Sequence, residues 1–278
     1  MNSAVLEKTM GYKSKRLFSV LHIECIYTFY LADYDSKFNF SGEAHDMWEL
    51  GCVRSGNMGI TSGTEIYDCT KDELVIHSPG VFHKAWAKDD NVTILTVSFS
   101  GTGTERFVPS GKFILTESER TIVELIEKHA ARDAENIAGE RKYESEQIVK
   151  NLLECLCLSL SMRKNENAAP DTHGAAAVFA EVAGYLTKNV ECALTIEKIC
   201  RDCAIGKTTL KELFNKYAGI GVIKYYNILR VQRAAELIAK GCSMAQIAEI
   251  MHFSSQNYFS AFFKRETGVT PSKYLKAD

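Results

Sequence analysis

The sequence predicts a two-domain α+β protein: a small β-barrel or sandwich with two following helices, and then an all-helical C-terminal module. Three observations lead to this class. Short β-type runs occur before residue 100, helical periodicity replaces them, and an internal repeat is confined to residues after 174. A chain of 278 residues is also long enough for about two domains, each with its own hydrophobic core.

The strands of the N-terminal half are predicted from short runs rich in apolar and β-branched residues. Turn-prone groups containing Gly, Asn, Ser or Pro divide these runs at regular spacing. The runs are residues 49–54, 58–60, 73–76 and 92–99. This pattern is typical of a small β-sandwich or barrel.

Two helices are predicted to follow the strands. Ile122 and Ile126 share one face of the first helix, and Glu117 and Glu119 lie near its start, where they complement the helix dipole. The second helix, over residues 148–160, carries a wide apolar stripe. That stripe suits either packing against the barrel or half of a dimer interface, and the sequence leaves both open.

A polar stretch that carries a proline and a glycine separates the halves. We expect a linker at 165–174 between a domain at 1–164 and a domain at 175–278. Residues 1–174 carry 19 Lys and Arg against 26 Asp and Glu, a net charge of −7. The remaining residues carry 14 against 9, a net charge of +5, so the chain total of −2 conceals a basic module suited to nucleic acid.

Composition also restricts the compartment. No apolar run approaches the ~20 residues of a membrane-spanning helix, and the N-terminus lacks a signal-peptide pattern. The nine cysteines are scattered and mostly flanked by apolar residues, which favours reduced thiols. Cys200 and Cys203 have zinc-like spacing, but no second ligand pair follows, so we expect them to pack in a core. These features predict a cytoplasmic protein without a membrane partner.

The basic module repeats itself. Three apolar positions recur 48 residues later, and three Gly or aromatic positions recur 49 residues later. The pairs are Ile196 and Met244, Ile199 and Ile247, Ile205 and Phe253, Phe214 and Phe263, Gly219 and Gly268, and Tyr225 and Tyr274. Each unit has a capped helix, a short turn and a second helix, with Thr195 and Ser243 as the caps. The module therefore predicts two helix-turn-helix units joined by a long helix over residues 225–238.

The second unit resembles the signature of AraC/XylS-type transcription regulators. The resemblance rests on Ile247, Ala248, Phe253, the aromatic run of the following helix, Gly268 and Pro271. The first unit fits as well, and together they cover the last third of the chain. One departure is His252, which stands where this family usually has a turn glycine. We expect His252 to adopt positive φ, which His tolerates better than β-branched residues.

This resemblance implies double-stranded DNA as the partner, with the second helix of each unit in successive major grooves. Side chains that point away from the predicted core are candidates to read bases. These are Lys207, Thr208, Lys211, Glu212, Ser255, Gln256, Asn257 and Ser260. Lys264 and Arg265 are better placed for phosphate contacts that set the register.

A second resemblance concerns the acidic half. His45-x3-Glu49-x6-Gly56 followed by Pro79-Gly80-x2-His83 resembles a cupin barrel, as found in sensor halves of the same family. Metal-binding cupins usually begin this motif with His-x-His, and here the first position is Glu43. Glu43, His45, Glu49 and His83 still offer N and O ligands to a divalent ion. Sensor barrels of this family have lost the metal and keep the cavity, so the resemblance implies no metal and no cofactor, and instead a small organic effector, such as a sugar, held by Glu43, His45, Glu49, His83 and Trp86. Trp48 is the weaker aromatic candidate because strand alternation turns it away from His45.

Together these features predict a non-enzymatic, effector-responsive transcription regulator that is a homodimer through the two central helices. RNA polymerase is a further candidate partner. Two alternatives remain open: a cupin-type metal-dependent enzyme, and a constitutive DNA-binding protein with a purely structural barrel. A duplicated helix-turn-helix has no use in an enzyme, which is why the regulator is preferred.

Overall fold

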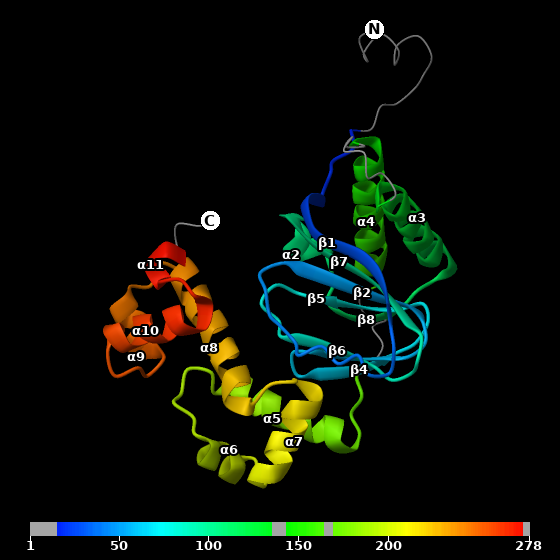
Figure 1. Cartoon of the computed structure of the whole chain (residues 1–278). Helices are drawn as coiled ribbons and strands as arrows, with labels where there is room; N and C mark the ends of the chain where they lie inside the picture. Colours follow the sequence, from blue (N-terminus) through cyan, green and yellow to red (C-terminus); the bar gives the residue numbers. More distant parts are fainter. Residues whose placement is uncertain (1–15, 135–142, 164–168, 275–278) are drawn as a thin grey trace, which may run out of the picture.

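The computed structural model describes residues 16–134, 143–163 and 169–274. A β-rich half with two long helices and one short helix is followed by an all-helical half, which confirms the predicted fold class (Figure 1). Residues 165–168 of the predicted linker, and residue 164 before it, lie outside the described residues. Among the described helices, none has the length and apolar character needed to cross a membrane.

The β-rich half consists of two antiparallel sheets rather than one continuous sheet. The larger sheet has the order β1-β7-β2-β5-β8 and the smaller one β4-β3-β6. The strands are β1 (His22–Tyr34), β2 (Trp48–Ser55), β3 (Met58–Ser62), β4 (Glu65–Cys69), β5 (Glu73–His77), β6 (His83–Ala87), β7 (Val92–Thr102) and β8 (Gly111–Ile114). The four predicted runs correspond to β2, β3, β5 and β7.

Helices cover the outer face of the larger sheet. A short α2 (Thr104–Phe107) precedes α3 (Glu117–Ala134) and α4 (Tyr143–Met162), which lie side by side on that face (Figure 1). Sheet residues such as Leu50 and Phe99 share one hydrophobic cluster with Val123, Leu153 and Leu160 of the helices. The apolar stripe of α4 is thus used mainly for packing on the sheet.

A buried ion pair joins the start of α3 to the end of α4. Glu119, whose side chain is fully buried, accepts hydrogen bonds from Arg163 just after α4 and from Ser159. It also accepts from the backbone and hydroxyl of Thr116, so it caps the start of α3. Burial alone would raise the pKa of Glu119, but Arg163 and the hydrogen bonds from Thr116 and Ser159 hold it at about 2. The residue expected from the sequence to complement a helix dipole therefore serves as a buried anchor.

The smaller sheet has helices on its outer side. Ile66 of β4 and Phe82 beside β6 belong to one hydrophobic cluster with Phe179, Phe214 and Tyr225 of the helical half. Figure 1 shows the layers in order: α3 and α4, the larger sheet, the smaller sheet, and then α5 and α7. The backbone of Asp171, within the predicted linker, donates to the carbonyl of Ile66 at 2.6 Å, so this part of the linker is attached to the edge strand β4.

The helical half contains the two predicted units and the helix that joins them. Its helices are α5 (Gly174–Lys188), α6 (Ile196–Asp202), α7 (Lys207–Tyr217), α8 (Val222–Ala239), α9 (Met244–Ile250), α10 (Gln256–Thr267) and α11 (Pro271–Tyr274). The side chains of Thr195 and Ser243 cap α6 and α9 as expected, and Ser243 forms a full capping box with Gln246. Cys200 and Cys203 are packed against the cluster that contains Phe214.

Replacing Glu119 with Gln should lower the free energy of unfolding at pH 7 by about 2–3 kcal/mol, because Arg163 loses its buried partner. The folded-state pKa of about 2 lies below the ordinary 4.5, so this stability is present above pH 4.5 and is lost as the pH falls toward 2. Urea unfolding at pH 7 and pH 3 measures both effects, with exposed Glu117→Gln as the control. An equal difference between wild type and Glu119→Gln at the two pH values would contradict this account.

Candidate functional site

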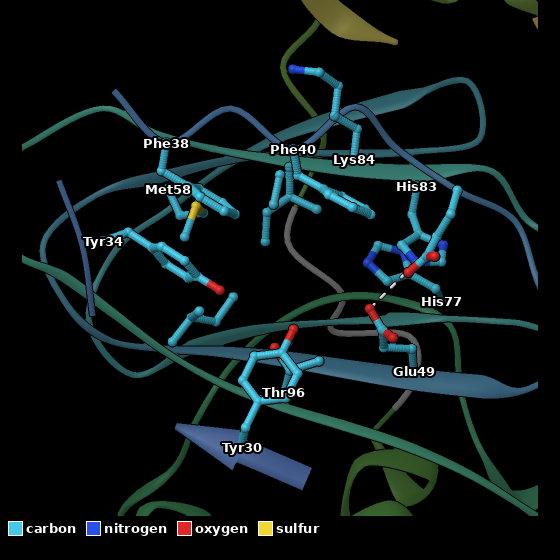
Figure 2. Close-up of a pocket in the computed structure, with 15 residues that line it drawn as sticks. Tyr30, Tyr34, Phe38, Phe40, Glu49, Met58, His77, His83, Lys84 and Thr96 are labelled. Carbon is cyan, nitrogen blue, oxygen red and sulfur yellow. Dashed lines mark ion pairs between the residues drawn. The ribbon is translucent and has the colours of Figure 1, made fainter. Parts of the chain in front are cut away.

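A cavity of about 290 Å³ lies between the two sheets. One end is polar and the other is apolar, as Figure 2 shows. The polar end has Glu43, Glu49, His77 and His83 in its lining. The apolar end is lined by Tyr30, Tyr34, Phe38, Phe40, Met58, Ile60 and Ile94, with Thr96 on the floor between them. A pocket of this kind, apolar with a few convergent polar groups, is the ordinary form of a small-molecule site.

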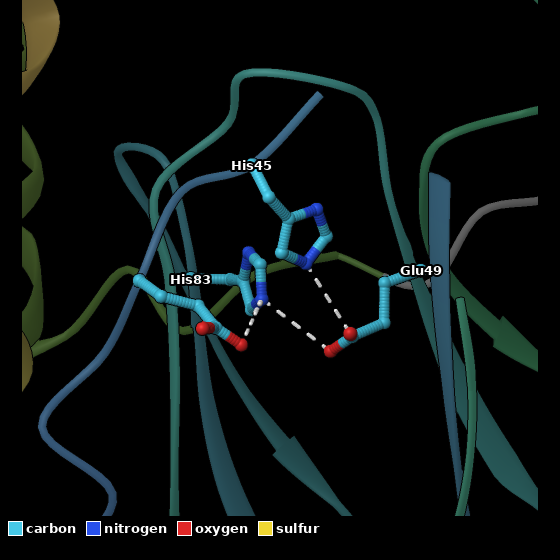
Figure 3. Close-up of side chains that lie close together, drawn as sticks. His45, Glu49 and His83 are labelled. Atoms are coloured by element: carbon cyan, nitrogen blue, oxygen red, sulfur yellow. Dashed lines mark hydrogen bonds and ion pairs between the residues drawn. The ribbon is translucent and has the colours of Figure 1, made fainter. Parts of the chain in front are cut away.

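The polar end is assembled from four segments that meet at Glu49 of β2. His83 of β6 places Nε2 3.3 Å from Glu49 Oε1, and His45 places Nε2 3.3 Å from Glu49 Oε2 (Figure 3). The Ser98 hydroxyl of β7 donates to Glu49 at 2.7 Å. Glu43 is bound to His83 by a pair of backbone hydrogen bonds, and its carboxylate lies 3.8 Å from His83 Nε2. Strand pairing therefore brings together residues that are far apart in the sequence.

These neighbours keep Glu49 ionised. Burial would raise its pKa, yet His45, His83 and Ser98 hold the pKa far below the usual range. The hydrogen bond to Glu49 in turn raises the pKa of His45 against the opposing effect of burial. His77 stacks on His83 and, because it is fully buried, has its pKa lowered to about 3, so it is neutral at physiological pH. The polar end thus combines an ionised carboxylate, the neutral imidazole of His77 and an imidazole of raised pKa at His45.

The same group has the donor set and spacing of a metal site. One ligand atom from each of Glu43, His45, Glu49 and His83 can be chosen so that all four lie within 4.8 Å of one another. His83 Nδ1 lies 3.0 Å from the Val81 carbonyl, which makes Nδ1 the protonated nitrogen. The buried Nε2 then faces two carboxylates without a hydrogen bond of good geometry. A lone pair in that position is repelled unless a proton or a cation lies between, so these residues fit a divalent ion.

Four of the five predicted effector residues converge here, and the fifth does not. Glu43, Glu49 and His83 line the cavity, and His45 contacts Glu49 beside it. Trp86 points to the other side of β6 and packs against Tyr217 of α7, with ring centroids 6.0 Å apart. Outward orientation follows from alternation, because Trp86 is three positions from the inward-facing His83. Trp48 packs in the core beneath the helices, as its expected orientation required.

Sequence reasoning missed most of the apolar end. Tyr30 and Tyr34 lie on β1, which was not predicted, although its run of aromatic and β-branched residues is a strand signal. Phe38 and Phe40 lie on a segment that pairs with β6 through backbone hydrogen bonds. The alternation Phe-x-Phe could have indicated an inward-facing stretch. His77 and Lys84 carried no sequence signal for the cavity.

The helix-turn-helix units place the candidate DNA-reading side chains in solvent. All of those on α7 are exposed, and so are those at the start of α10, with Ser260 half-buried. Ser255 also caps α10 by accepting a hydrogen bond from Tyr258 N. Leu210, Phe214, Phe259 and Phe263 are buried, which fixes the outward orientation that the sequence predicted. Lys264 and Arg265 are exposed on the last turn of α10.

The two turns share an unusual backbone conformation. Ala204 has φ of 51° and His252 has φ of 52°, and they are equivalent positions of the 48-residue repeat. The expected positive φ at His252 is confirmed. The left-handed conformation costs a non-glycine residue about 1–2 kcal/mol. Both units therefore keep the geometry of a glycine turn without the glycine.

A buried cation joins the connecting helix to the second unit. Arg230 of α8 donates to the carbonyl of Met251 at 2.6 Å, at the C-terminal end of α9. Its guanidinium lies 4.1 Å from the centre of the Phe253 ring and 5.4 Å from that of Phe262. These contacts fix the second unit on the long helix. The spacing between the two units therefore follows from the length of α8.

A ligand-sized cavity thus lies in one half of the chain, and two exposed helix-turn-helix units make up the other. Residues 26–181 match the family model of the AraC-like ligand binding domain, and residues 199–277 match a helix-turn-helix domain. The first match covers more than half of the chain. The protein belongs to the AraC family.

Similar proteins are regulators that match about a third of the chain. The uncharacterized HTH-type transcriptional regulator YijO of Escherichia coli is 32% identical over 103 residues, which is 36% of each chain. The virulence regulon transcriptional activator VirF of Yersinia enterocolitica is 33% identical over 90 residues, 32% of this chain and 33% of VirF. The chain thus spans about a third of the length of the curated relatives it matches.

Among solved structures, ToxT from Vibrio cholerae O395 aligns over 89% of this chain and 97% of that chain, with 16% identity and a TM-score of 0.36. The C-terminal domain of AraT from Geobacillus stearothermophilus is 26% identical, covering 36% of this chain and 85% of that chain, with a TM-score of 0.35.

Replacing His252 with Gly should raise the free energy of unfolding by about 0.5–1 kcal/mol, since the strain at φ 52° is relieved at a modest entropic cost. His252→Ala keeps the strain and serves as the control. Thermal unfolding followed by circular dichroism measures the change. A melting temperature of His252→Gly at or below that of wild type would contradict the inferred strain.

Proposed function

We propose that the chain binds a small molecule in the cavity between its sheets and reads a specific DNA sequence with α7 and α10. The observation that carries this proposal is the occurrence, in one chain, of a cavity with a buried ionised carboxylate and two exposed recognition helices. We retain the division into a sensor at 1–164, a linker at 165–174 and a reader at 175–278. We also propose that the protein is located in the cytoplasm and that RNA polymerase is one of its partners.

We propose further that the effector has an apolar body and a head that donates hydrogen bonds or carries positive charge. The ionised Glu49 and the nearby Glu43 favour donors. Lys84 is the one lysine or arginine in the described lining, but its side chain points away from the cavity (Figure 2), where its ammonium is bonded to Asn39 and to a carbonyl of α7. The stacked Tyr34 and Phe38 rings suit a flat or aliphatic group. A sugar, the effector expected from the sequence, would match the polar end better than the apolar one.

A divalent ion is a second candidate ligand, favoured by the convergence of two imidazoles and two carboxylates. Glu43, His45, Glu49 and His83 would hold it, and the Val81 carbonyl would orient His83. When bound, such an ion would supply a positive centre to which an anionic or oxygen-rich effector could attach. This differs from the metal-free cavity expected from the sequence.

The proposed homodimer would use the outward side of α4. Ile148 is 40% exposed and Met162 is 90% exposed, and Cys155 lies between them on the exposed side. These residues recur at spacings of seven, as neighbours on one helical face do. Two copies of this stripe are self-complementary across a two-fold axis, which is the commonest symmetry of soluble dimers.

Replacing Gln256 with Ala should weaken discrimination at one base pair by about 1–3 kcal/mol and leave affinity for other sequence changes intact. Lys264→Ala is the matched control, because a lost phosphate contact lowers affinity for all sequences and reduces the salt dependence by about one counterion. Binding is measured with a duplex selected by the wild-type chain and its single-base variants. A uniform loss of affinity in Gln256→Ala would contradict direct base reading.

Replacing Glu49 with Gln should weaken Zn²⁺ binding by about tenfold or more, because the ionised carboxylate at the centre of the cluster is lost. Isothermal titration of the metal-free chain measures this, with exposed Glu105→Gln as the control. Equal Zn²⁺ affinity in wild type and Glu49→Gln would mean that the ion binds at another position.

A thermal-shift comparison of long-chain amines and sugars tests the organic effector. We expect the amines to stabilise the wild-type chain and to lose this effect in Glu49→Gln. Turnover of any bound compound would instead favour the enzyme alternative.

A further inference from the structure

The C-terminal end of the first recognition helix rests on the sensor. The last carbonyls of an α-helix have no partner within the helix and are usually satisfied by a cap, by water or by other side chains. In α7 the Phe214 carbonyl is used by Ala218 N of the following turn. The Thr61 hydroxyl of β3 donates to the Tyr217 carbonyl at 2.6 Å, and Lys84 Nζ of β6 lies 3.1 Å from the Lys216 carbonyl.

Both sensor side chains are buried by this contact. Thr61 is 0% exposed and Lys84 is 1% exposed, an unusual environment for a lysine. The ammonium of Lys84 is also bonded to Asn39 and lies 4.6 Å from the centre of the Trp86 ring. A cation at the C-terminal end of a helix is favoured by the helix dipole. Burial lowers the pKa of Lys84 to about 8, so the amine is held here at a cost that its partners offset.

The surrounding packing leaves little room for another arrangement. Gly219, just after α7, has φ of 69°, and a Cβ there would lie 2.9 Å from Lys84 Cε and from the Ser41 carbonyl oxygen. Tyr225 of α8 donates to the Gly63 carbonyl at 3.1 Å, and its ring packs against Phe82. The end of α7 and the turn after it therefore pack closely against the sensor, and Tyr225 at the start of α8 makes a further hydrogen bond to it.

The docked face leaves the reading face of α7 free. Lys207, Thr208, Lys211 and Glu212 are exposed, and they lie in the first half of the helix. The sensor side chains Thr61 and Lys84 bond to carbonyls at the other end. A DNA duplex bound along the reading face would therefore meet a helix whose C-terminal end is already held.

We propose that Thr61 and Lys84 are positioning residues for DNA reading: the smaller sheet of the sensor supplies the C-cap of α7 and holds this recognition helix for the major groove. The inference rests on the proposed role of α7 in reading DNA. It assigns to the sensor a direct structural part in the first DNA-binding unit. Both residues act through the last turn of α7 rather than through contacts with DNA.

Hydrogen exchange of the full chain tests the cap without DNA. Thr61→Val removes the hydroxyl and keeps the shape, and Lys84→Met removes the ammonium and keeps most of the stem. We expect exchange of the amides in 213–219 to accelerate about fivefold in either variant, because the last turn opens more often. Thr61→Ser should restore the wild-type rate, and exposed Lys88→Met, just beyond β6, should leave it unchanged. If Lys84→Met does not fold, the comparison of Thr61→Val with Thr61→Ser tests the cap by itself.

DNA binding tests the positioning role. The probe is a duplex selected from a random-sequence pool by the wild-type chain. We expect affinity to fall about three- to tenfold in Thr61→Val and to return in Thr61→Ser, with an unchanged dependence on salt because no phosphate contact is lost. Unchanged exchange at 213–219, or faster exchange with unchanged or higher affinity, would overturn the proposal. If the wild-type chain enriches no sequence, the proposed DNA reading fails as well, whereas normal enrichment with unchanged exchange overturns the cap alone.

Discussion

Side-chain alternation along β3 and β6 is the constraint on which the rest of the structure depends. Successive residues of a strand point to opposite faces, so Ile60 and His83 face the cavity while Thr61 and Lys84 face the helical half. One thin sheet therefore serves as the wall of the cavity and as the platform for α7. Any change in the position of β6 that accommodates a ligand at His83 is also a change in the position of Lys84. The smaller sheet is therefore a structural part of both halves of the protein.

Burial of charge at Glu49 sets the chemical character of the cavity. A carboxylate in a mostly apolar pocket would ordinarily become neutral, because desolvation disfavours its ionised form. Here two imidazoles and the Ser98 hydroxyl supply enough stabilisation to keep it ionised. Both carboxylate oxygens contact these partners, and Glu49 also lines the cavity. This buried negative charge is why we propose a cationic head or a metal ion for the same position.

The fold class and the location of the polar end could be predicted from the sequence, because these depend on local patterns. The apolar and β-branched runs of the strands, the repeat in the helical half and the spacing of His45, Glu49 and His83 are all visible in the chain itself. The predicted orientation of Trp86 was wrong: the sequence placed it near a motif histidine, but three positions along β6 put its side chain on the opposite face of the strand from His83. The contact of Thr61 with Tyr217, 156 positions away, has no local signal at all. Hydrophobic periodicity predicts individual helices and strands, but it does not predict how two domains pack against each other.

The departures from the family pattern fall into two physical classes. At His252 the chain keeps the backbone conformation of the family and accepts strain, since the turn geometry is fixed by the helices on both sides. At Glu43 the chain changes the donor set instead, and a carboxylate stands where metal-binding cupins have an imidazole. The backbone there is held by its pairing with His83, so the new side chain still points to the same group. His83 in turn is oriented by the Val81 carbonyl, as a ligand imidazole would be. Because the scaffold and the orientation of His83 are retained while the charge becomes more negative, we expect the substitution to alter what the cavity binds rather than to abolish the proposed site.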